Sequence, residues 1–270
     1  MKITINSCQF GFDLMGYMET HNQQAVPPIV LIHGLGLDRT IWHPLVSGHL
    51  SDFEVIMPDM LGHGESDAPQ GPYPMSLMAE NLAELLETLD ISKAIVCGHS
   101  MGGYVALAFA SQFPQMLAGL GLITTNAYAD SEEKRTGRYD LIKKIKEQGA
   151  IALAESLAPK LSRDPVVIKK SHQLISKTKP MGLIGALEGM ALRPDRTAFL
   201  PEVDVPAIVA AGEDDQITNY DEAQLMAEAL PQGQFLGLPN VGHMPMLEDP
   251  AALGEGLQAL FQRVIESSSG

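Results

Sequence analysis

Short runs of consecutive apolar residues recur along the chain, separated by longer stretches with helical spacing. A continuous apolar run of about four residues is typical of a strand buried on both faces of a parallel sheet. Such runs lie at residues 29–32, 54–57, 94–97, 120–123 and 207–210, with a weaker one at 234–236. Helical patterns lie between them, at 76–89, 100–112, 219–229 and 250–265. The alternation predicts an α/β fold with a mostly parallel central sheet and helices on both faces.

The N-terminal segment has a different pattern. Residues 2–8 and 10–18 predict two strands joined by a turn near Gly11. The polar tract from Thr20 to Pro28 ends in two prolines, which favour a connection over a regular element.

The alternation stops between residues 126 and 198. This stretch has helical patterns alone, at 131–148, 149–157, 164–177 and 180–192. Ligand sites of open α/β sheets lie outside the carboxyl ends of the strands, so an insertion leaving from such an end would cover the site. We therefore predict a core domain of residues 1–125 and 199–270 and a helical cap, or lid, of residues 126–198.

Charge divides the chain in the same way. The formal net charge is −15, which disfavours nucleic acid and anionic lipid as partners. The predicted cap nevertheless holds 14 Lys and Arg against 9 Asp and Glu, whereas the rest of the chain holds 4 against 24. This asymmetry supports a distinct structural unit.

The chain lacks the patterns expected of membrane and secreted proteins. No apolar run approaches the roughly 20 residues that a membrane span needs. The first residues lack the apolar core of a secretory signal. We expect a cytoplasmic protein, a monomer or homodimer, without a membrane partner.

A candidate nucleophile lies in the sequence Gly-x-Ser-x-Gly at residues 98–102, with Ser100 at its centre. A strand pattern precedes the motif and a helical pattern follows it, which is the context that a nucleophile elbow requires. The turn residue takes a strained backbone conformation, and its neighbours two places away approach each other closely. Glycine at both places avoids a Cβ clash.

The motif and its companions resemble those of the α/β-hydrolase superfamily. Supporting blocks stand in the family's order: His-Gly-Leu-Gly at 33–36, Asp-Met-Leu-Gly-His-Gly-Glu-Ser at 59–66, Gly-Glu-Asp-Asp at 212–215 and Gly-His-Met-Pro at 242–245. The resemblance covers roughly residues 29–125 and 200–265. We interpret the block at 59–66 as structural, a tight loop that supports the strand and loop of the expected oxyanion donor, with substrate contact as the alternative.

A serine hydroxyl needs a base, and the base needs an orienting acid. His243 follows the last strand pattern and fits the chain order Ser…Asp…His, so we expect it to be the base. Asp214 and Asp215 both follow the strand at 207–210, and family resemblance favours Asp215. Some relatives take the acid from the loop before the cap, but Thr124-Thr125-Asn126 offers no carboxylate there.

Acyl transfer also needs donors for the developing oxyanion. One should be the backbone N–H of Met101, the residue after the nucleophile. The other should come from the loop after the first buried strand, where the resemblance implies the N–H of Leu35.

These residues predict a serine hydrolase of the carboxylesterase type that acts on a small-molecule ester or lactone without a metal or other cofactor. Alternatives are a lactonase such as 3-oxoadipate enol-lactonase, a carbon–carbon bond hydrolase, or a ligand-binding receptor of the same fold. The predicted cap lacks long continuous apolar runs, which favours short- to medium-chain esters, although residues 181–187 could line an acyl pocket. An anionic substrate would be favoured if cap cations face the pocket, the candidates being Arg135, Arg138, Lys143, Arg193 and Arg196.

Overall fold

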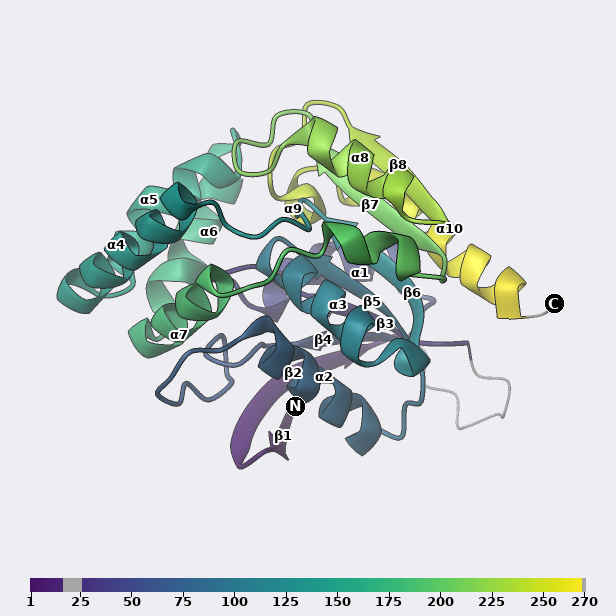
Figure 1. Ribbon diagram of the computed structural model, residues 1–270, viewed down its shortest axis with the longest axis horizontal. Coiled ribbons are helices and arrows are strands. Elements are labelled where there is room, and N and C mark those ends of the chain that lie inside the picture. The colour runs from purple at the N-terminus through teal and green to yellow at the C-terminus, as the bar shows by residue number, and fades with distance from the viewer. Residues whose placement is uncertain (17–25, 269–270) are drawn as a thin grey trace.

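A mostly parallel eight-stranded sheet forms the centre of the computed structural model, which describes residues 1–16 and 26–268 (Figure 1). Its strand order is β1-β2-β4-β3-β5-β6-β7-β8. The strands are β1 (Lys2–Ile5), β2 (Cys8–Met15), β3 (Ile29–Ile32), β4 (Val55–Pro58), β5 (Ala94–His99), β6 (Leu117–Ile123), β7 (Ala207–Gly212) and β8 (Gly233–Leu238). Pairings from β4 to β8 are parallel, while β1–β2 and β2–β4 are antiparallel. The predicted α/β fold is confirmed.

The central strands are buried as their apolar runs predict. Every residue of β3, β4, β5 and β7 is buried, because helices cover both faces of the sheet. β8 lies at the edge and is mostly half-buried, which explains its weaker apolar pattern.

The turn predicted near Gly11 is wrong, since β1 and β2 are joined at Asn6 and Ser7. Both residues have positive φ angles, 49° and 66°, as a two-residue hairpin turn requires. Gly11 lies inside β2, where a Cβ would come within 2.9 Å of the Glu65 Cβ. The glycine therefore serves a close approach and not a turn. The last two positions of the second predicted strand, and most of the connection after it, lie outside the described residues.

Helices lie on both faces of the sheet (Figure 1). α2 packs against α3 on one face, and α1 packs against α10 on the other. The bounds of the core helices are α1 (His43–His49), α2 (Met75–Thr88), α3 (Met101–Gln112), α8 (Tyr220–Ala229), α9 (Pro245–Glu248) and α10 (Pro250–Ser268). Three 3₁₀ segments span Arg39–Ile41, Pro114–Met116 and Thr197–Glu202. α1 and α9 were not predicted, because each is too short to show the repeat of apolar residues that marks a helix.

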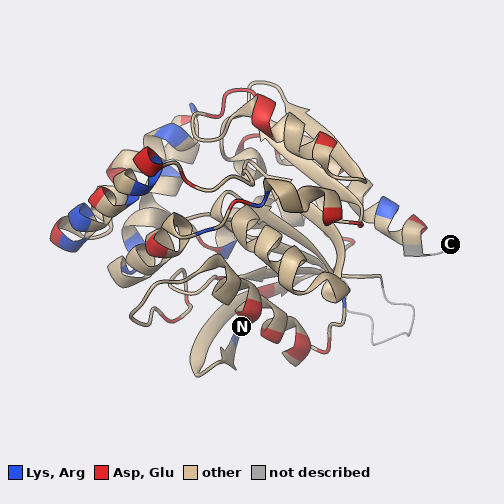
Figure 2. Ribbon diagram, in the orientation of Figure 1, with Lys and Arg blue, Asp and Glu red and all other residues tan. Residues whose placement is uncertain are grey.

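Four helices lie between β6 and β7 and form a group beside the sheet (Figure 1). They are α4 (Glu132–Gln148), α5 (Ile151–Leu161), α6 (Pro165–Lys177) and α7 (Pro180–Ala191). Lys and Arg gather on this group, whereas Asp and Glu outnumber them on the rest of the fold (Figure 2). The exact division into core and cap stays a prediction, and the segment from α4 to α7 is called the helical insertion below.

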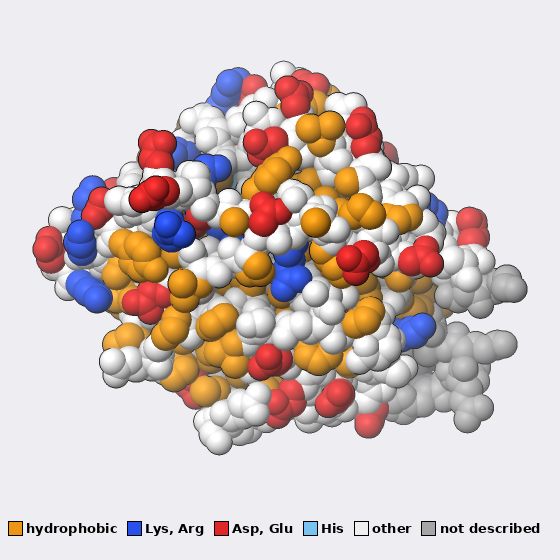
Figure 3. All heavy atoms as spheres, viewed as in Figure 1, with side chains coloured by type: hydrophobic (Ala, Val, Ile, Leu, Met, Phe, Trp, Pro, Cys, Tyr) orange, Lys and Arg blue, Asp and Glu red, His pale blue; other side chains and the backbone are white. Residues whose placement is uncertain are grey.

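The glycines of α7 let this helix lie directly on the core. A Cβ on Gly182 would come within 1.9 Å of the Gly62 carbonyl oxygen, and one on Gly189 within 1.8 Å of the Tyr73 carbonyl oxygen. One side of the segment predicted to line an acyl pocket is therefore packed against the core. Met181, at its start, is 44% exposed. In the space-filling view, exposed apolar side chains lie among the charged ones at this end of the molecule (Figure 3).

Candidate active site

Ser100 lies at a sharp turn between β5 and α3. Its φ and ψ angles are 53° and −115°, a conformation that a residue with a side chain adopts only under constraint. The Ser100 N–H donates to the Ile123 carbonyl oxygen at 3.0 Å, and the Thr125 hydroxyl donates to the Ser100 carbonyl oxygen at 2.7 Å. Neighbouring β6 and the residues after it thus hold the strained turn in place.

The two motif glycines allow this turn. A Cβ on Gly98 would lie 2.0 Å from the Gly102 carbonyl oxygen, and one on Gly102 would lie 2.4 Å from the Ile32 carbonyl oxygen. Both distances are far below van der Waals contact. The requirement for glycine two places before and after Ser100 therefore has a steric cause in this fold.

His243 and Asp215 form a buried pair. The distance from His243 Nδ1 to Asp215 Oδ2 is 2.8 Å, and each side chain is 1% exposed. Because an ionised carboxylate can only accept, Nδ1 carries the proton and Nε2 of a neutral imidazole is left as an acceptor. This is the tautomer that a general base for a hydroxyl group needs.

Several donors hold the Asp215 carboxylate. The Ile217 N–H donates to Oδ1 at 2.7 Å and the Thr218 hydroxyl donates to Oδ2. Burial by itself would raise the pKa of Asp215, but the interaction with His243 and these hydrogen bonds outweigh it and lower that pKa. Asp214 instead accepts from Arg163 Nη1 at 2.7 Å. Of the two candidate acids, Asp215 is the one beside His243.

His99 and Thr124 link the turn at Ser100 to His243. His99 Nε2 donates to the His243 carbonyl oxygen at 2.8 Å, and the Thr124 hydroxyl donates to the same oxygen at 3.1 Å. The imidazole centroids of His99 and His243 are 5.0 Å apart. Neither residue has a predicted role at the site. His99 lies within the motif and Thr124 directly follows β6, but their contact with His243 depends on the tertiary fold.

The loop after β3 presses against the turn at Ser100. A Cβ on Gly34 would lie 2.8 Å from His99 Nδ1 and 3.2 Å from the Ser100 Cβ. Leu35 therefore lies in a loop adjoining Ser100, and Met101 begins α3, where N–H groups lack partners within the helix. The assignment of these two N–H groups as oxyanion donors remains a prediction.

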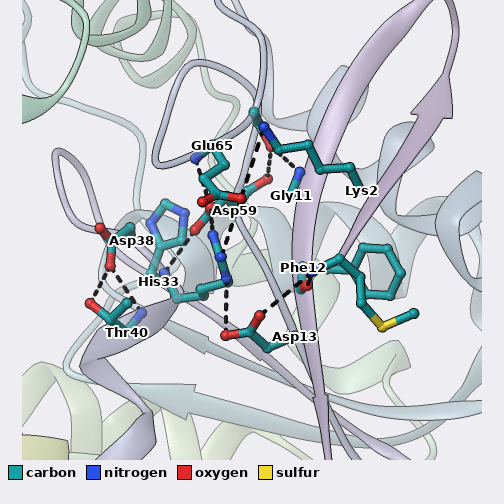
Figure 4. A network of polar contacts seen from close by, with 12 residues as sticks. Lys2, Gly11, Phe12, Asp13, His33, Asp38, Thr40, Asp59 and Glu65 are labelled. Atoms are coloured by element: carbon teal, nitrogen blue, oxygen red, sulfur yellow. Dashed lines mark hydrogen bonds and ion pairs between the residues drawn. The ribbon is translucent and has the colours of Figure 1, made fainter.

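A network of ion pairs, centred on a buried carboxylate, holds the chain next to this loop (Figure 4). Asp59, which is fully buried, accepts from the Arg39 N–H at 2.9 Å and forms an ion pair with the Arg39 guanidinium. The same guanidinium contacts Asp13 at 3.1 Å and Glu65 at 3.4 Å. His33 adds a neutral link, since its Nε2 accepts from the Met60 N–H at 3.0 Å. The block at 59–66 thus fixes the chain just after the loop that adjoins Ser100.

Carboxylates form ion pairs with several cations of the helical insertion and of the residues beside it. Asp130 binds both Arg138 and Arg193, and Lys143 pairs with Asp140 at 2.9 Å. Burial alone would raise the pKa of Asp130, but the two guanidinium groups lower it. These three cations therefore lie in ion pairs within the insertion and its flanks.

Arg196 has a different setting. A small surface hollow lies beside α3, lined by Met75, Tyr104, Leu107, Asn126, Ala127, Arg193, Pro194 and Arg196. Burial lowers the pKa of the Arg196 guanidinium. Arg196, which follows α7, is therefore the cation of the predicted cap to test against an anionic substrate, while Arg135 is exposed on α4.

Two further features of residues 1–16 and 26–268 bear on function. No cluster of three or more His, Cys, Asp or Glu in these ranges could hold a metal ion. Likewise, none of the helices in this part of the chain has the length and apolar character to cross a bilayer.

Residues 29–255 match the model of the alpha/beta hydrolase family. The chain belongs to this family. It is 35% identical to a thermophilic esterase from Thermogutta terrifontis with malate bound, with a TM-score of 0.90 over 98% of each chain. It is 27% identical to the enol-lactonase from Burkholderia xenovorans LB400, with a TM-score of 0.87 over 97% of this chain and 100% of the other. Its sequence is 25% identical to 3-oxoadipate enol-lactonase 2 of Acinetobacter baylyi, covering 90% of this chain and 92% of the relative. Esterases and enol-lactonases are therefore among the proteins that this alpha/beta hydrolase resembles.

Proposed function

We propose that this alpha/beta hydrolase is a carboxylic ester hydrolase that works through Ser100, His243 and Asp215. The observation that carries the proposal is the buried 2.8 Å contact between His243 and Asp215, beside a strained serine turn. Ser100 Oγ attacks the ester carbonyl carbon while His243 Nε2 takes its proton. The imidazolium then gives that proton to the departing alcohol. Water cleaves the resulting acyl-enzyme by the same steps in reverse, which releases the acid and restores Ser100.

Charge stabilisation in this mechanism comes from the buried acid and the backbone. Asp215 is held as a carboxylate by its hydrogen bonds, so it can stabilise the imidazolium as that charge forms. The N–H groups of Leu35 and Met101 receive the oxyanion, and each such donor typically accounts for about 3–4 kcal/mol of the barrier.

The helical insertion favours a small substrate. Leu153 on α5 and Ile175 on α6 come within 3.1–3.3 Å of where a Cβ on Gly36 would lie. The Thr178 hydroxyl donates to the Gly36 carbonyl oxygen at 2.9 Å. The insertion therefore lies directly on the loop that adjoins Ser100, and short- to medium-chain esters fit this arrangement better than long-chain lipids.

A p-nitrophenyl ester series of increasing acyl length tests the proposal. We expect repeated turnover with a maximum below about twelve carbons, and a loss of at least about 10⁴-fold in Ser100→Ala because the nucleophile is removed. A maximum at longer chains would contradict the size argument. Single turnover with tight retention of the ligand would instead support a receptor.

A lactonase is the second candidate, because enol-lactonases are among the relatives. The same triad would open a cyclic ester, so a lactone panel run beside the ester panel separates the two. If carboxylate-bearing substrates are preferred, the preference should fall in Arg196→Ala. Equal rates for a carboxylate-bearing ester and a neutral ester of the same size would argue against an anionic pocket.

A further inference from the structure

The junction between α5 and α6 of the helical insertion reaches the loops that carry the proposed base and acid. The Leu161 carbonyl oxygen accepts from the His243 N–H at 2.9 Å. The Ser162 hydroxyl donates to Glu248 Oε2 at 2.8 Å. Residues 161–163, called the cap junction below, therefore touch the loop of His243 at two successive positions. The third residue of the junction is Arg163, which binds the aspartate preceding Asp215.

Glu248 holds the loop of His243 from the core side. Its Oε2 accepts from the Gly242 N–H at 3.1 Å, and its Oε1 accepts from the Met244 N–H at 2.9 Å. The carboxylate thus binds the residues immediately before and after His243, and Ser162 binds the same carboxylate. A Cβ on Gly242 would lie 3.2 Å from both Glu248 carboxylate oxygens and from the Leu161 carbonyl oxygen, so the three segments are closely packed.

The backbone of His243 is consequently fixed at both of its polar groups. Its N–H is bound by the cap junction, and its carbonyl oxygen is bound by His99 and Thr124 of the core. The position of the imidazole relative to Ser100 then depends on the insertion as well as on the core. Displacement of a catalytic group by about 1 Å can cost about 10²-fold in rate, so such anchoring bears directly on turnover.

We propose that Ser162 and Glu248 are positioning residues, which align His243 as general base by docking the helical insertion on its loop. This proposal rests on the proposed function, since it takes His243 as the base for Ser100. The neighbouring chemistry supports it, because hydrogen bonds to a charged carboxylate are stronger and more directional than neutral ones. A purely adhesive role would hold the insertion in place without any effect on the alignment of the base.

Ser162→Ala tests the proposal, with Ser156→Ala as its matched control. Ser156 lies on α5, which ends just before Ser162; it is exposed and donates to the Leu153 carbonyl oxygen. Ester or lactone turnover is measured per active site, with the sites counted by a fluorophosphonate that labels Ser100. We expect kcat of Ser162→Ala to fall about tenfold with KM nearly unchanged, because a hydrogen bond to a charged group is lost. Ser156→Ala should keep the wild-type values.

Two more variants distinguish the alignment of His243 from simple attachment of the helical insertion. Ser162 has extended backbone angles, φ −159° and ψ 165°, which a β-branched residue also adopts, so Ser162→Thr should restore kcat by returning the hydroxyl. Glu248→Gln should lower kcat at least as much as Ser162→Ala, since an amide nitrogen cannot accept from a backbone N–H. Glu255→Gln, at an exposed position of α10, is the control and should behave as wild type.

The outcomes distinguish this proposal from the one on which it rests. If the wild type turns over esters or lactones and Ser162→Ala matches Ser156→Ala per active site, the positioning role is overturned and the proposed function stands. A kcat loss in Ser162→Ala that Ser162→Thr does not restore also overturns it. If the wild type shows no turnover and its Ser100 is not labelled, the proposed function fails and the positioning role fails with it.

Discussion

Acid should destabilise this protein through histidines that are buried in neutral form, among them His63 and His99. Burial, followed by the neighbouring His33, lowers the pKa of His63 to about 3. Burial, with a further contribution from His243, lowers the pKa of His99 to about 3. In the unfolded chain, a histidine titrates near ~6.5. Between these values the unfolded state binds protons that the folded state does not, so the free energy of unfolding falls as the pH falls below about 6.5.

The expected magnitude follows from this difference. One pKa unit corresponds to about 1.4 kcal/mol, so each histidine should remove about 2 kcal/mol of stability between about pH 7 and pH 5, and the pair about 4 kcal/mol. The lowered pKa of Asp215 acts in a different window, because an unfolded aspartate titrates near ~3.9. Above about pH 5 the histidines should therefore dominate the decline.

Urea unfolding followed by circular dichroism across this pH range measures the effect. His63→Asn retains a donor for the Leu61 carbonyl oxygen, which His63 contacts at 3.1 Å, but removes the titrating group. Its loss of stability between about pH 7 and pH 5 should be about 2 kcal/mol smaller than that of the wild type. Leu61→Ala is the control, because a buried cavity lowers stability by a similar amount at every pH. A His63→Asn decline as steep as that of the wild type would refute the reasoning.

Three other substitutions test the acid and the ionic network. Asp215→Asn should lower kcat on esters by about 10⁴-fold through loss of the correct His243 tautomer, while Asp214→Asn should lose far less, and equal losses would contradict the assignment of Asp215. Arg39→Met leaves the fully buried Asp59 without its guanidinium, so the free energy of unfolding should drop by about 3–5 kcal/mol in urea titrations. A drop below about 1 kcal/mol, as at an exposed pair, would show that the network contributes little.

The sequence was sufficient for the parallel sheet and for the turn at Ser100, because both follow from local constraints. Four-residue apolar runs indicate strands that are buried on both faces, and β3, β4, β5 and β7 are buried throughout. The glycines at 98 and 102 are required by contacts close to the turn itself. By contrast, the first hairpin was placed at the wrong turn, since Asn6 and Ser7 adopt positive φ angles without a glycine signal.

The arrangement around His243 was decided by the tertiary structure. The choice between Asp214 and Asp215 rested on family resemblance alone, and the fold separates them by turning one toward Arg163 and the other toward His243. Ser162 lies between two predicted helices in a segment with no motif, and its contact with Glu248 joins positions that are 86 residues apart. Such contacts depend on how the insertion lies on the sheet, and no local pattern of side chains encodes that docking. The sequence thus determined the fold and the family, whereas only tertiary packing decided which groups hold the histidine.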